Sequence, residues 1–79
     1  MALYFFDIRD SDSFDEDDRG LGLPDLDAAK AQAATTLAEL ARDVIPGSWK
    51  RELAINVRDE RGPVLKVQMT FKAMLLRTS

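Results

Sequence analysis

The chain has 79 residues, 46% of them hydrophobic, and a formal net charge of −3. It contains neither cysteine nor histidine, which excludes disulfides, thiolate or imidazole metal centres and the commonest general base. This length and composition predict one small globular domain over residues 1–79, whose thin core favours support from a partner chain.

The charge is uneven along the chain, and no segment is strongly apolar. Residues 1–27 hold nine acids and two bases, whereas residues 28–79 hold five acids and nine bases. Mild net acidity argues against broad binding to a phosphate backbone, so nucleic acid is a less favoured partner. No stretch approaches the roughly 20 apolar residues of a membrane span, and no basic leader is present. We therefore expect a cytoplasmic protein without membrane contact.

The first predicted element is a β-strand from Ala2 to Arg9. Its side chains alternate between two faces. Tyr4, Phe6 and Ile8 form the expected core face, and Leu3, Phe5, Asp7 and Arg9 form the other.

Residues 10–18 form a predicted polar loop that holds six acids. An EF-hand frame beginning at Asp10 places Phe14 where an oxygen ligand is required, and one beginning at Asp15 places Arg19 there. We interpret the segment as a solvated loop and keep two alternatives, weak binding of a hard cation and contact with a basic partner surface. Nothing shelters these carboxylates for acid–base chemistry, so we expect no catalytic, cofactor or metal residues. Residues 20–23 could add a short strand.

An amphipathic helix is predicted from Leu26 to Val44 or Ile45, with Asp25 as its N-terminal cap. One stripe should pack on the sheet: Leu26, Ala29, Ala33, Leu37, Leu40 and Val44. A second stripe lies about 120° around the helix: Ala31, Ala34, Ala38, Ala41 and Ile45. This second stripe indicates either high helix propensity alone or a close contact with a second copy of the chain.

The last third of the chain predicts a β-hairpin. A three-residue loop, Glu60 to Gly62, would place Asp59 opposite Pro63. The resulting apolar cross-strand pairs are Val57–Leu65, Ile55–Val67 and Leu53–Met69. The fold class is therefore α+β, with β-α-β-β order and one helix on a three-stranded, mainly antiparallel sheet. We expect the first strand to lie beside the last, with parallel pairing to residues 53–57 as the alternative.

Two features of the sequence are candidate contact surfaces. The outer sheet face, with Phe5, Arg9, Arg58 and Lys66, indicates a solvated surface or, alternatively, a nucleic-acid platform. Trp49 either closes the end of the core or anchors an interface.

Three segments carry a family resemblance: Tyr4-Phe-Phe-Asp-Ile-Arg-Asp10, Gly20-Leu-Gly-Leu-Pro-Asp-Leu-Asp-Ala-Ala29, and Leu53 to Gly62 with Val64-Leu65. Together they resemble a family of small bacterial proteins known only as a domain of unknown function. Many members carry His where this chain has Asp7. The resemblance implies a single short domain and no activity. The Pro-Asp-Leu segment before the helix is also similar to that of HicB-type antitoxins, an analogy only.

These features predict a non-catalytic interaction domain that forms a homodimer or binds another protein. The predicted interface residues are Ala31, Ala34, Ala38, Ala41, Ile45, Phe5 and Trp49. The alternatives are an antitoxin-like regulator associated with nucleic acid and a weakly cation-binding acidic loop.

Overall fold

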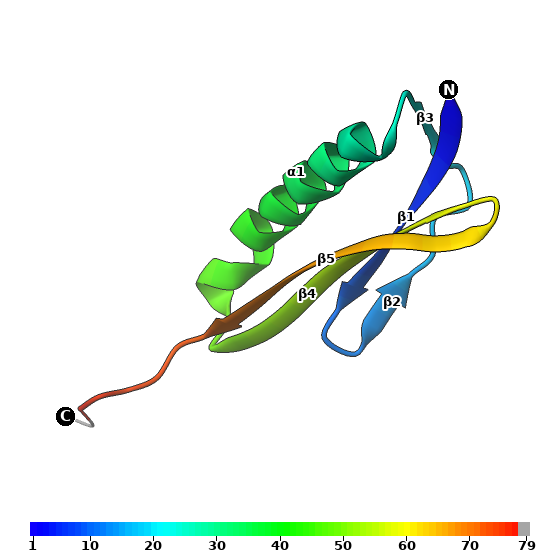
Figure 1. Cartoon of the computed structure of the whole chain (residues 1–79). Helices are drawn as coiled ribbons and strands as arrows, with labels where there is room; N and C mark the ends of the chain where they lie inside the picture. The colour runs from blue at the N-terminus through cyan, green and yellow to red at the C-terminus, as the bar shows by residue number, and fades with distance from the viewer. Residues whose placement is uncertain (78–79) are drawn as a thin grey trace.

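The computed structural model describes residues 1–77, which form five strands and one long helix (Figure 1). The elements in chain order are β1 (Ala2–Asp10), β2 (Ser13–Asp15), β3 (Leu21–Leu23), α1 (Leu26–Val44), the 3-10 turn η1 (Ile45–Gly47), β4 (Lys50–Asp59) and β5 (Gly62–Lys72). The α+β prediction of one helix on an antiparallel sheet is confirmed, and the short strand expected at residues 20–23 is β3.

The predicted place of the first strand is wrong. β1 pairs with β4, not with β5, and the pairing is antiparallel, so Phe6 lies opposite Val57. The path of the chain through β2 and β3 explains this position of β1. β3 ends beside Ala2, so α1 begins at the end of the sheet where β1 begins. α1 then runs in the same direction as β1, and β4 returns antiparallel beside β1. β4 suits the central position because its helix-side residues, Leu53, Ile55 and Val57, are the largest fully buried side chains.

β2 and β3 pair with the two ends of β1 in succession and together form one edge of the sheet. Ile8 lies opposite Asp15 in β2, whereas Tyr4 lies opposite Leu21 in β3. The residues between these strands, 16–20, bulge out of the ladder. The acidic segment that the sequence predicted as a plain solvated loop is therefore part of a strand edge.

The hairpin of β4 and β5 has the three predicted apolar pairs, Val57–Leu65, Ile55–Val67 and Leu53–Met69. The turn is shorter than expected, because Asp59 lies opposite Gly62 and the register shifts between Val57 and Arg58. Gly62 has a φ of +126°, a conformation that side-chain-bearing residues rarely adopt. The apolar pattern thus determined the register of the strands, while the glycine determined the turn.

α1 begins at the predicted cap, where the Asp25 side chain accepts a hydrogen bond from the Ala28 N–H. Its buried residues pack on β4 and β5, and the largest fully buried side chains, Leu53, Ile55 and Val57, all come from β4. The helix residues in this core are Ala29, Ala33, Leu37 and Ala41. Leu26 was expected in the same stripe, but 47% of its surface is exposed because it lies in the first turn, at the end of the sheet.

The molecule is elongated, with principal extents of 56 × 21 × 17 Å. Beyond β5, the chain runs away from the body as an extended segment (Figure 1). Within residues 1–77, no helix is long and apolar enough to cross a membrane.

Candidate functional site

The outer edge of the sheet at β5 is open, because β5 pairs only with β4 in the described part of the chain. An apolar groove lies between this edge and the C-terminal half of the helix. Its lining residues are Ala41, Arg42, Ile45, Pro46, Met69, Thr70 and Phe71. Met69 keeps 40% of its surface exposed although its side chain is on the helix side of the sheet. The described part of the chain leaves this apolar surface uncovered.

The structure divides the predicted alanine stripe into two parts. Ala41 is buried and Ile45 half-buried, and both line the groove beside β5. Ala31, Ala34 and Ala38 are exposed on the turns of α1 that precede them. We call the combined surface of Ala34, Ala38, Ala41, Ile45, Met69 and Phe71 the β5 flank. It joins a small-residue helix face to a strand edge, which the sequence alone did not bring together.

Trp49 lies at the end of the β5 flank and does not close the core, since 62% of its surface is exposed. It borders a second apolar hollow with Ile45, Pro46 and Phe71. The extended segment after β5 adds exposed apolar side chains at Met74, Leu75 and Leu76. The interpretation of Trp49 as a core plug is therefore wrong, and its interpretation as an interface anchor stays a prediction.

The opposite edge of the sheet is closed by a side chain, Asp17. Its Oδ2 accepts the Phe6 N–H at 3.1 Å, taking the place of a ladder bond where β2 and β3 are interrupted. Its Oδ1 accepts the N–H groups of Arg19 and Gly20. The pKa of Asp17 lies below its usual value. Burial is the largest single influence and acts to raise this pKa, but the three N–H donors and the charge of Arg58 together outweigh it.

Asp7 and Arg58 complete this closed edge from β1 and β4. Asp7 is 6% exposed and accepts both the Asp17 N–H at 2.9 Å and the Arg58 Nε at 2.9 Å. Arg58 Nη2 also donates to the Asp17 carbonyl at 2.7 Å, and its guanidinium lies 4.5 Å from the centre of the Phe5 ring. Phe5, a predicted interface residue, is thus half-buried beneath an arginine.

A second ion pair joins the end of β1 to β4. Arg51 donates from Nε and Nη2 to the two carboxylate oxygens of Asp10, at 2.7 and 2.9 Å. The hydrogen bond from Arg51 is the main reason that the pKa of Asp10 lies below its usual value, and burial opposes this lowering. Ser48 fixes the guanidinium from the other side by accepting from Nη1.

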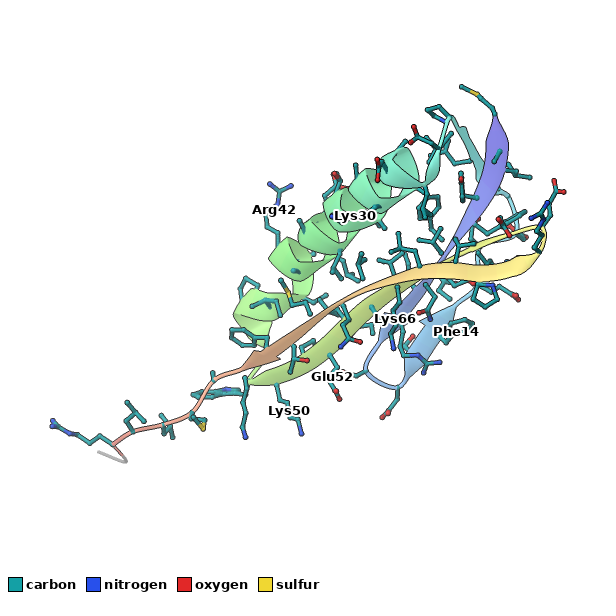
Figure 2. The ribbon with its side chains drawn as sticks, in the orientation of Figure 1. Phe14, Lys30, Arg42, Lys50, Glu52 and Lys66 are labelled. Carbon is teal, nitrogen blue, oxygen red and sulfur yellow. The ribbon has the colours of Figure 1, made fainter. Side chains whose placement is uncertain are left out.

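These contacts bear on the alternatives drawn from the sequence. Asp10 and Asp17 are engaged by protein donors, and no group of three metal-ligating side chains occurs within residues 1–77. Arg58, counted as a free base of the outer sheet face, is held by Asp7 and by the Asp17 carbonyl. Arg9 stacks on Phe14 at 5.0 Å. On the face of the sheet opposite the helix, Lys50 and Glu52 of β4 project into solvent (Figure 2). The basic platform is weaker than the sequence suggested.

A comparison with protein families identifies the chain's relatives. Residues 3–70 match the model of DUF6894, a domain of unknown function, and the chain belongs to this family. No curated protein and no solved structure matches the chain. The match covers the helix and every strand except Ala2 of β1 and the last two residues of β5.

Proposed function

We propose that this chain is a non-catalytic interaction domain that associates with a second copy of itself through the β5 flank. The observation that carries the proposal is an eleven-residue edge strand lying beside an exposed alanine face and an apolar groove. Long, flat edge strands invite pairing with another chain unless a charge, a bulge or a covering element blocks them. β5 has Pro63 and two lysines, but Val67, Met69 and Phe71 face the helix side without charge.

Small helix residues support close approach by a second helix. Ala34 and Ala38 are exposed and short, so the long side chain on this part of the helix is that of Arg42, which lines the groove one turn further on. A thin two-layer domain gains apolar burial from a partner that it cannot obtain alone. Self-association through this surface would cover the exposed part of Met69 and fill the groove between α1 and β5.

The non-catalytic part of the proposal draws on the engagement of the carboxylates. Asp7, Asp10, Asp17 and Asp25 all accept hydrogen bonds that hold the fold together. Within residues 1–77, every buried side-chain nitrogen or oxygen has a hydrogen-bond partner. An active site ordinarily keeps such groups available to a substrate.

The test is the molar mass in solution, measured by light scattering at tens of micromolar protein. The wild type should have about twice its chain mass of 8.8 kDa. Met69→Glu places a charge in the β5 flank and should shift the protein toward the monomer.

Gln68→Glu is the matched control. Gln68 is next to Met69 in β5 and points to the opposite face of the sheet, so this substitution adds the same charge outside the β5 flank. It should leave the mass unchanged, and circular dichroism should show both variants folded. A wild type that stays monomeric at these concentrations would overturn the proposal.

A further inference from the structure

The β5 flank is self-complementary in a way that determines how two copies meet. β5 alternates apolar residues toward the helix with Lys66, Gln68 and Thr70 toward the open face. Two such strands related by a two-fold axis place like faces together, so the sheet and its core continue from one copy to the next.

Resting on the proposed self-association, we infer that two copies pair their β5 strands antiparallel, with Val67 on the two-fold axis. Val67 is the middle residue of β5. About this axis Gly62 lies opposite Lys72 of the partner copy, and Lys66 lies opposite Gln68 of the partner copy. Leu65 to Met69 of the two copies are then paired in regular register, and the irregularity at Val64 lies beyond this stretch. The backbone edge that is open in a single copy is closed over this central stretch.

Charge favours this register over its neighbours. The turn at one end of β5 contains Asp59, Glu60 and Arg61, with a net charge of −1, and the other end carries Lys72. The antiparallel arrangement brings Lys72 of each copy beside this mixed turn of the other, so the ends of the strand contribute little to the choice of register. An axis moved to Met69 would instead set Lys66 directly opposite Lys72 twice, and like charges directly opposite one another are destabilising.

The same axis determines where the two α1 helices lie relative to each other. Ala41 of α1 borders Met69 and Phe71, and α1 runs in the direction of β5 from its N-terminal end (Figure 1). One helical turn before Ala41 is Ala38, and Ala34 precedes it on the same side. These exposed alanines therefore lie near Val67 and would face their counterparts across the axis. A contact between small residues permits close approach of the two helices.

The absence of cysteine from the chain makes a direct test practical. Three single variants are prepared, Lys66→Cys, Gln68→Cys and Thr70→Cys, all at exposed positions on the open sheet face. Pairs are mixed under mild oxidation, with one member carrying a mass tag, and mixed disulfide dimers are quantified by gel electrophoresis. Disulfides need Cα atoms within about 7 Å of each other, so cross-linking reports the register.

The Lys66→Cys and Gln68→Cys mixture should cross-link several-fold more than either protein alone. Strongest cross-linking between Gln68→Cys and Thr70→Cys would place the axis at Met69 and overturn the inferred register. A dimer by light scattering that cross-links in neither mixture would overturn β5 pairing while leaving self-association intact. A monomer would remove both proposals together.

Discussion

The two edges of the sheet differ in how they deal with an unpaired backbone. At the β2–β3 edge, short strands, a bulge and a set of carboxylates interrupt the ladder, and Asp17 accepts the Phe6 N–H in place of a ladder bond. At the β5 edge, an eleven-residue strand lies beside an apolar groove, and its register with β4 is regular from Leu65 to Lys72. Natural sheets use bulges, short strands and charge to prevent unwanted pairing. The β2–β3 edge has all three devices, whereas from Leu65 to Lys72 the β5 edge has only its two lysines.

The chain contains many acidic residues, and acidic residues can block pairing at an edge strand. Here they are concentrated at the opposite edge of the sheet, between Asp10 and Asp18. There, Asp7 and Arg58 tie the bulge to the two central strands, β1 and β4. The closed edge gives the acidic segment a structural role, and β5 is the edge that the described part of the chain leaves unpaired.

The strongest way to test the closed edge is to remove Asp7. Asp7→Ala leaves the Asp17 N–H without its acceptor and Arg58 without its main partner. We expect the free energy of unfolding to fall by about 2–3 kcal/mol, as for loss of hydrogen bonds to a charged group in a buried position. Urea denaturation measures this change.

Asp18→Ala is the control for Asp7→Ala, since it makes the same chemical change at an exposed residue of the same segment. It should alter the free energy of unfolding by less than about 0.5 kcal/mol. Equal losses in both variants would show that the Asp7 network does not hold the bulge.

A smaller effect is expected at Gly20, where the chain returns from the bulge into β3. Gly20 has a φ of +76°, and an added Cβ would lie 3.0 Å from Leu3 Cδ1 and from Phe5 Cε1. Gly20→Ala should reduce the free energy of unfolding by about 1–2 kcal/mol, from backbone strain and crowding.

Gly47→Ala is the matched control for Gly20→Ala, because no atom lies within 4 Å of its added Cβ. It should leave stability unchanged or raise it slightly, since alanine restricts the unfolded chain. Thermal melting of the two variants separates them, and a harmless Gly20→Ala would argue against a rigid closed edge.

The smallest expected effect concerns acid pH. The pKa of Asp10 is lowered from 3.8 in the folded protein, so its ion pair with Arg51 stabilises the fold above that value. This contribution is lost as pH falls through 3.8 toward the folded pKa. The melting temperature of the wild type should exceed that of Asp10→Asn near neutral pH, and the difference should shrink in this acidic range.

Asp12→Asn serves as the reference for Asp10→Asn, because Asp12 is exposed in the same turn. Near neutral pH its melting temperature should match that of the wild type, because Asp12 makes no ion pair among the described contacts. A constant difference between wild type and Asp10→Asn down to pH 2 would contradict the assigned direction of the shift.

The parts of the fold that were predictable are those determined by side-chain alternation and by local capping. The apolar pairs of the hairpin follow from the period of two in each strand, and the start of α1 follows from Asp25. The position of β1 was not predictable in this way. It depends on β2, whose Ser13 and Asp15 flank a single apolar residue and give no strand signal.

The closed edge was missed because its contacts join residues far apart in the sequence. Asp17 looked like one of six equivalent acids, and only its position opposite the Phe6 N–H distinguishes it. One signal was available: Asp7 is an acid within an aromatic strand, and Arg58 is a base diagonally across from it on the same outer face of the sheet. The correct neighbour for β1 would have brought the two together. Of the β5 flank, the sequence predicted the alanine stripe of the helix but not the strand edge that lies beside it.

The pairing of β1 with β4 joins residues far apart in the sequence, such as Phe5 and Arg58, and this separation bears on how the protein folds. The β4–β5 hairpin needs only its own turn to form, so it can assemble early from local contacts. β1 can dock only after the whole intervening chain has been closed into a loop, at a loss of entropy. Until then, β4 has no neighbour on its inner side. We therefore expect β4 to gain its second neighbour late in folding.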